Sequence, residues 1–279
     1  MAEDQTLPSK KRKAAVAKPA APAKRVPSAA SAKAKTAAKV EKPKKAKKIT
    51  YSPAEIRALF ERFKQANPEP KGELEHTNPF TLVVAVALSA QATDVSVNKA
   101  TRELFRLADT PEKMVALGEY RVSDLIKTIG LFRTKAKNVI ALSQLLIDKF
   151  GGEVPQTREE LVQLPGVGQK TANVVLNTAF GQSTIAVDTH IFRLSNRLGI
   201  APGRTPVAVE KTLEAIIPDE FKRDSHHWLI LHGRYICNAR VPDCSHCVIA
   251  DLCKFPDKTN EVAYWPETAS RTAAADQPA

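Results

Sequence analysis

The sequence lacks the features of a membrane-spanning or secreted protein. Its longest apolar stretch, FTLVVAVALSA at residues 80–90, is too short to cross a bilayer and is typical of a buried helix. The N-terminus is charged and has no apolar signal core, which argues against secretion. We therefore expect no association with a membrane.

Aromatic residues are absent before Tyr51, and residues 1–50 consist mainly of Lys, Ala, Pro, Ser and Val. This segment holds 15 basic and three acidic residues, so it carries the whole formal net charge of +12, and the rest is balanced at 27 of each sign. Such a segment buries too little surface to offset its ordering entropy, so we expect residues 1–50, and also residues 266–279, to be disordered. The basic tail is either a solvated linker or a polycation that holds the protein near DNA by counterion release.

The sequence also lacks alternating apolar segments and the dipeptides typical of β-hairpins. Its start and stop signals are those of helices. Helix starts are indicated by cap-then-proline pairs and capping boxes, at Ser52-Pro53 with Glu55, Asn78-Pro79, Thr110-Pro111, Thr157 with Glu160, and Thr205-Pro206. Helix ends are indicated by Gly130, Gly151, Gly181 and Gly199. The pattern predicts an all-α fold with roughly ten helices.

The string LPGVGQKTANVVL at residues 164–176 is the most informative local motif. Gly166 and Gly168 interrupt an apolar pattern directly before a helix, and glycine leaves no side chain between the backbone and a ligand. The N–H groups of the turn, beside the positive end of the helix dipole, form a site suited to a DNA phosphate. Two glycines alone would fit an ordinary turn, but the full string indicates a helix-hairpin-helix.

Lys170 and Asp188 form a candidate catalytic pair. Lys170 lies in the first turn of the helix after the hairpin, where the helix dipole disfavours the ammonium form and so favours a nucleophilic amine. Asp188 precedes the next helix as an expected N-cap, and its carboxylate could also deprotonate a nucleophile or stabilise a cationic sugar. Spacing alone does not bring the two groups into contact.

The only four cysteines are Cys237, Cys244, Cys247 and Cys253, in the pattern C-x6-C-x2-C-x5-C. Their clustering argues against a disulfide framework and indicates a metal site in a reducing compartment. A four-cysteine zinc site and a [4Fe–4S] cluster both remain open, and the six-residue gap favours iron–sulfur.

Together these motifs closely resemble the endonuclease III family. The likeness rests on LSAQATDVSVNKAT at 88–101, LPGVGQKTANVVLNTAFG at 164–181, IAVDTHIFRLSNRLG at 185–199 and the cysteine pattern, and it runs from about Tyr51 to Pro266. The resemblance implies a helix-hairpin-helix glycosylase fold of two domains. A six-helix barrel would cover residues 72–182, and a [4Fe–4S] cluster domain would combine residues 51–71 with residues 183–265.

The resemblance implies a bifunctional DNA glycosylase and abasic-site lyase of base-excision repair. It would remove oxidised or saturated pyrimidines from duplex DNA and cut 3′ to the abasic site by Schiff-base β-elimination. Lys170 would be the Schiff-base lysine and Asp188 the catalytic aspartate, and the four cysteines would hold the [4Fe–4S] cluster. Gln91 would fill the gap left by the flipped base and Leu131 would wedge the opposite strand. The expected DNA contacts are Gln91, Leu131, Gly166, Val167, Gly168, Lys170 and His190.

The chain departs from the family pattern in the loop at residues 238–243, which holds one base, Arg240, and one acid, Asp243, where the family tends to be basic.

Alternatives are an adenine or thymine-mismatch glycosylase, which Lys170 disfavours, and a non-enzymatic DNA-binding factor. We interpret His226, His227 and His232 as structural. We expect a monomer that acts on double-stranded DNA carrying damaged pyrimidines or abasic sites, in the cytoplasm at a bacterial nucleoid.

Overall fold

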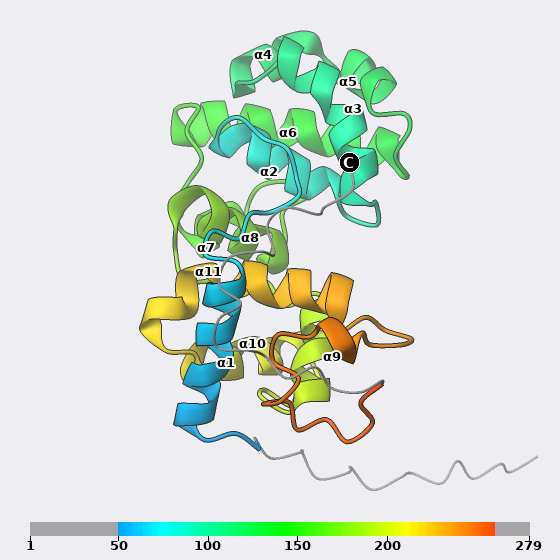
Figure 1. Cartoon of the computed structure of the whole chain (residues 1–279). Helices are drawn as coiled ribbons and strands as arrows, with labels where there is room; N and C mark the ends of the chain where they lie inside the picture. Colours follow the sequence, from blue (N-terminus) through cyan, green and yellow to red (C-terminus); the bar gives the residue numbers. More distant parts are fainter. Residues whose placement is uncertain (1–49, 260–279) are drawn as a thin grey trace, which may run out of the picture. The chain divides into compact units, whose positions relative to one another are not determined.

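A computed structural model describes residues 50–259, and the predictions for residues 1–49 and 260–279 lie outside this range. Within it there are eleven α-helices, a π-helical turn and a 3₁₀ turn, and no strand (Figure 1). The predicted all-α fold is therefore confirmed. The elements are α1 (Pro53–Ala66), α2 (Pro79–Leu88), α3 (Asp94–Leu107), α4 (Pro111–Leu117), α5 (Glu119–Leu125), α6 (Phe132–Phe150), α7 (Arg158–Leu161), α8 (Gln169–Phe180), α9 (Thr189–Leu198), α10 (Pro206–Ile216), α11 (Asp219–Leu231), the π-helix η1 (His232–Ile236) and the 3₁₀ turn η2 (Cys244–His246).

Most helix starts follow the predicted caps. Ser52 and Asn78 each close a full capping box, and Thr110 and Thr205 each accept a first-turn N–H ahead of a proline. The box at Thr157 is only half formed: its hydroxyl accepts the N–H of Glu160, but it donates to the Glu160 carboxylate at 2.6 Å. That carboxylate is therefore paired with the Thr157 side chain.

Three of the four glycines that were predicted to end helices do so. Gly151, Gly181 and Gly199 are left-handed C-caps of α6, α8 and α9. The prediction at Gly130 is wrong, because α5 ends at Leu125 and an irregular turn follows it. Ile126 and Ile129 of that turn are buried, so core packing holds the segment before α6 begins.

One hydrophobic cluster gathers the helices between residues 80 and 176. Helix α2 lies at its centre and packs against α3, α6 and α8, while α6 also packs against α4 and α5 (Figure 1). Eight of the ten α2 residues are buried, as expected for its unbroken apolar sequence. Each large apolar side chain buried in this way stabilises the fold by about 1.5–3 kcal/mol.

A second hydrophobic cluster combines the first helix with the later ones, α9, α10 and α11. Phe60 of α1 stacks on Phe221 of α11 with 6.1 Å between ring centroids, and Trp228 packs against both rings. The Trp228 indole N–H donates to the Asn67 carbonyl at 2.8 Å, which satisfies the only polar group of that side chain. Residues far apart in the sequence thus share one core.

No helix among the described residues is both long enough and apolar enough to traverse a bilayer.

Candidate active site

A cavity of about 250 Å³ is lined by residues from the helices of both hydrophobic clusters. Lys170 and Thr171 come from the start of α8, Asp188 from the start of α9, and His226 from α11. Gln91 from the segment between α2 and α3, Asp94 at the start of α3 and Arg234 of η1 add further polar groups to the wall. Lys170 and Asp188, which the sequence could not bring together, therefore line the same cavity.

Lys170 is the second residue of α8 and is exposed. The N-cap of this helix is Gly168, which offers no side-chain hydrogen bond to the first turn. The N–H groups of that turn are therefore left for a ligand, beside the positive end of the helix. An amine on this turn is accessible to a substrate that enters the cavity.

Asp188 is the predicted N-cap of α9. Its Oδ1 accepts the backbone N–H of Ile191 at 2.8 Å, and the residue is half-buried. The preceding residues Ile185 to Val187 are buried, so they anchor the chain on one side of the carboxylate. The cap bond on the other side holds the carboxylate in a defined position at the cavity wall.

The hairpin joins α7 to α8 in a tight turn. Gly166 has φ 83°, where a side chain would be strained, and an added Cβ would lie 3.2 Å from Asn138 of α6. Gly168 has an extended backbone, and nothing lies within 4 Å of the position of a Cβ there. Val167 between them is buried in the first hydrophobic cluster. Only its backbone is thus available for the DNA contact expected of this residue.

Gln91 and Leu131 are the only non-glycine residues with positive φ among residues 50–259, at 57° and 58°. Both are exposed, Leu131 by 62%. They also line a common cavity of about 160 Å³ together with Gly166 of the hairpin. The two residues that the family resemblance assigns to insertion into DNA thus share a strained conformation and lie around one recess.

Lys135 of α6 lines this second cavity and is only 7% exposed. Its Nζ is buried and has no hydrogen-bond partner among the described residues. Burial lowers the pKa of Lys135, because a desolvated ammonium is disfavoured.

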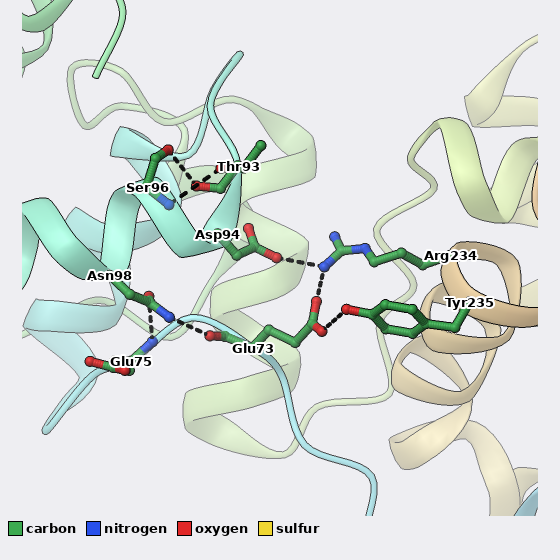
Figure 2. Close-up of polar contacts among 8 residues, drawn as sticks. All are labelled: Glu73, Glu75, Thr93, Asp94, Ser96, Asn98, Arg234 and Tyr235. Atoms are coloured by element: carbon green, nitrogen blue, oxygen red, sulfur yellow. Dashed lines mark hydrogen bonds and ion pairs between the residues drawn. The ribbon is translucent and has the colours of Figure 1, made fainter. Parts of the chain in front are cut away.

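A cluster of ion pairs lies at the edge of the main cavity, and Figure 2 shows its members. Arg234 of η1 pairs with Asp94 at the start of α3, at 2.7 Å, and with Glu73 in the segment between α1 and α2. The Tyr235 hydroxyl donates to Glu73 as well. Burial raises the pKa of Asp94, whereas the nearby charge of Lys170 lowers it. Asp94 is thus a further carboxyl group in the wall of the cavity that Lys170 lines.

The π-helix η1 brings Arg234 to this position. Gly233 lets η1 pass close to α9, because a Cβ there would lie 3.0 Å from the His190 carbonyl oxygen. Arg193 of α9 donates to the Gly233 and Cys237 carbonyls. His190 itself is half-buried in the first turn of α9, two residues after Asp188.

The four cysteines line one pocket and none of them forms a disulfide. Arg197 donates to the Cys237 Sγ at 3.4 Å, and the Phe255 N–H donates to the Cys253 Sγ at 3.5 Å. Burial raises the pKa of Cys247 to about 12, and the other three cysteines act in the same direction. Four soft sulfur donors around one pocket, two of them accepting N–H groups, have the chemistry of iron–sulfur ligands.

Residues 50–259 contain no group of three or more His, Cys, Asp or Glu side chains arranged as ligands of one metal ion.

Sequence reasoning missed several residues of the site. Asp94 follows Thr93, the N-cap of α3, and so has the sequence signature of an ordinary first-turn acid. Glu73 and Arg234 are 161 residues apart, and no local pattern indicates their pairing. The one sequence signal for Asp94 was its place in the string LSAQATDVSVNKAT, which is part of the family resemblance.

Comparison with known proteins matches this geometry to one family. Residues 84–219 match the HhH-GPD superfamily of base excision DNA repair proteins. The endonuclease III of Treponema pallidum (strain Nichols) is 57% identical over 198 residues, which make up 71% of this chain and 94% of that protein. The endonuclease III of Escherichia coli (strain K12) is 55% identical over 202 residues, which make up 72% of this chain and 96% of that protein. The chain belongs to the endonuclease III family.

Solved structures agree with this assignment. A trapped covalent endonuclease III–DNA intermediate, an estranged-adenine complex, matches with a TM-score of 0.68 and 46% identity over 73% of this chain and 96% of that chain. A thermostable thymine-DNA glycosylase matches with a TM-score of 0.65 at 24% identity, over 72% of this chain and 96% of that chain, and it shows the fold alone. The expected helix-hairpin-helix glycosylase fold is confirmed, and the chain is an enzyme of base-excision repair.

Proposed function

We propose that this endonuclease III family member removes oxidised or saturated pyrimidines from duplex DNA and then cleaves the strand 3′ to the abasic site. The observation that carries the proposal is the presence of Lys170 and Asp188 in the wall of one cavity. A nucleophilic amine and a fixed carboxylate are the two groups that a Schiff-base glycosylase requires.

The proposed chemistry starts with proton transfer from the Lys170 ammonium to the Asp188 carboxylate. The free amine attacks sugar C1′, the C1′–N bond to the damaged base breaks, and the base leaves with the bonding electron pair and takes up a proton. The alkylated amine then loses a proton, the C1′–O4′ bond breaks with its electron pair going to O4′, and O4′ takes up a proton, which leaves an iminium between Lys170 and C1′. A base then removes a proton from C2′, and the 3′ phosphate leaves with the C3′–O electron pair.

The DNA contacts follow from the same residues. The open N–H groups around Gly168 and the first turn of α8 would hold a phosphate next to the damaged nucleotide. Gln91 and Leu131 would enter the duplex as the base leaves it, which offsets part of the unstacking cost of a few kcal/mol. His190 would contact the backbone near Asp188. Damaged or abasic duplex DNA is thus the proposed partner.

Cys237, Cys244, Cys247 and Cys253 would hold a [4Fe–4S] cluster. When bound, the cluster would supply iron–thiolate bonds that tie residues 237–253 together. Arg193 and Arg197 of α9 would keep this segment beside the helix that Asp188 caps. We propose that the two hydrophobic clusters are the cores of the barrel domain and the cluster domain, and that the protein acts as a monomer at a bacterial nucleoid.

The test is a covalent trap with a duplex that carries one thymine glycol. Borohydride reduces an iminium to a stable amine, so we expect the wild-type protein to become attached to the DNA. Lys170→Ala should give no adduct, because the nucleophile is absent. Lys137→Ala, at an exposed position on α6, is the matched control and should trap as the wild type does.

The contrary outcomes separate the parts of the proposal. Release of the base without an adduct would mean a glycosylase that lacks the lysine mechanism. If protein that carries its cluster gives no base release and no adduct, the proposed activity on this lesion is rejected. An adduct in Lys170→Ala would assign the nucleophile to another amine.

A further inference from the structure

His226 is a buried polar side chain in the wall of the main cavity. It lies on α11, is only 3% exposed, and contributes to the same cavity as Lys170 and Asp188. Its Nδ1 is buried without a hydrogen-bond partner among residues 50–259. Native proteins pair nearly all such buried groups, so an unpaired one is unusual.

The contacts of His226 do not explain its presence as a structural residue. Its ring meets the His227 ring edge to face, with 5.2 Å between centroids, and this contact leaves Nδ1 unpaired. His232 differs, because its Nε2 lies 3.6 Å from the Cys247 Sγ and its ring packs on Phe63. No hydrogen bond of the His226 side chain to the described residues fixes its ring, although the ring lines the cavity.

The charge state of His226 suits it to a neutral ligand. Burial lowers its pKa to about 3, and the charges of His227 and Lys170 act in the same direction. At neutral pH the ring therefore carries one N–H donor and one acceptor nitrogen.

The rest of the cavity has the composition of a binding site for a small flat ring. Its apolar lining includes Val86, Val174 and Ile230, and Thr178 adds a hydroxyl. An apolar wall with a few polar groups is the usual form of a ligand pocket. Lys170 lines the same cavity as His226, so a ring bound there would share the cavity with the reacting amine.

We propose that His226 recognises the everted pyrimidine by donating a hydrogen bond to a carbonyl oxygen of its ring. This inference rests on the proposed function and assigns to His226 the role of a specificity-determining residue for the base. The ligand class is a neutral pyrimidine ring, oxidised or saturated, that has left the DNA stack. The proposed role goes beyond the structural one that we expected for His226 from the sequence.

The experiment compares two duplexes of the same sequence, one with a thymine glycol and one with an abasic site. The abasic duplex has no base to recognise, so strand cleavage on it reports Lys170 chemistry without His226. We expect His226→Leu to slow single-turnover base release about 10- to 100-fold, the range that corresponds to about 1.4–2.8 kcal/mol. Cleavage of the abasic duplex should stay within about twofold of wild type. His226→Gln, which keeps a donor, should recover part of the base release.

Three outcomes would overturn the inference. Unchanged base release in His226→Leu would show that the ring does not contact the base. An equal loss on both duplexes, or an equal loss in His226→Gln, would show a structural role. If His226→Leu does not fold, the comparison is made with His226→Gln and His226→Phe.

A binding measurement separates this inference from the proposed function. In the Lys170→Ala background, we expect the preference for thymine glycol over undamaged duplex to fall when His226→Leu is added. A preserved preference would overturn the role of His226. Failure of wild-type protein on both the lesion and the abasic duplex would instead reject the proposed function.

Discussion

Gln91 and Leu131 hold left-handed backbone conformations on the surface. A residue with a Cβ is less stable by about 1–2 kcal/mol in the left-handed region of φ/ψ space. Such strain persists where the surrounding structure enforces it, and it is often tied to function. At Leu131 the chain also exposes a large apolar side chain that stabilises no core. Both costs fall on a residue proposed to enter DNA.

Leu131→Asn should separate stability from activity. Asparagine tolerates the left-handed region better than leucine, so the free energy of unfolding should stay the same or rise by up to about 1 kcal/mol. Base release should fall about tenfold, since the wedge is lost. Thermal denaturation and single-turnover kinetics measure the two effects. Val207→Asn, at an exposed position on α10, is the control and should leave base release unchanged. Reduced stability together with unchanged base release in Leu131→Asn would contradict the prediction.

His226 should make the protein sensitive to acid. Its pKa is about 3 in the folded protein and about 6.5 in the unfolded chain, so between these values only the unfolded chain binds the proton. The free energy of unfolding should therefore fall as pH drops below about 6.5, by up to about 1.4 kcal/mol per unit from this residue. Denaturant titrations of wild type and His226→Gln between pH 7 and pH 4.5 measure the difference. Equal pH slopes for both proteins would refute the assignment.

Single-residue prediction succeeded where the signal was local. The N-cap role of Asp188 needs only a polar residue before an amphipathic helix, and the structure shows that cap. The burial of Lys135 and His226 depends on helices far away in sequence, and leucine and glutamine give no sign of positive φ. These features follow from tertiary packing and were therefore not predictable.

At the scale of elements, caps and prolines placed most helix starts, whereas two features escaped prediction. The end of α5 is set by the burial of Ile126 and Ile129, although Gly130 looks like the stop signal. The π-helix η1 has no sequence signature, because it depends on how closely Gly233 approaches α9. Without η1, the position of Arg234 could not be inferred.

Arg234→Met tests the ion-pair cluster of Figure 2. The side chains of Arg234, Glu73 and Asp94 are all less than a third exposed, so removal of the arginine leaves two carboxylates poorly solvated. We expect a loss of about 1–3 kcal/mol in the free energy of unfolding, measured by urea denaturation. Base release should fall too, since Asp94 loses the partner that holds it.

Arg102→Met is the matched control, because Arg102 pairs with Glu75 on the same segment but both side chains are more than half exposed. Exposed pairs contribute little, so its stability should match wild type. Equal losses in the two variants would show that Arg234 has no special role.

At the scale of the whole molecule, charge is segregated along the chain. Residues 1–50 carry the full formal charge of +12, while the remainder is balanced. Backbone N–H groups at the hairpin can bind phosphate without a basic surface, so a neutral fold is compatible with the proposed DNA binding.

Deletion of residues 1–49 should lower DNA affinity most at low salt. Removing one lysine–phosphate pair reduces the slope of log K against log salt by about 0.9, so the truncated protein should show a flatter dependence. Binding to undamaged duplex between 50 and 200 mM salt measures the slopes. Equal slopes for the full-length and truncated proteins would show that the tail does not bind DNA phosphates.

Helix α9 has Asp188 at its start, and its arginines reach the first cysteine and the loop after it. A helix of ten residues is about 15 Å long, and each added residue rotates the remainder of the helix by about 100°. An insertion or deletion inside α9 would therefore rotate Arg193 and Arg197 away from their carbonyl partners while Asp188 stayed in place. The length of this helix, as well as its sequence, is thus constrained, and natural variation in chain length should fall in the loops that flank it.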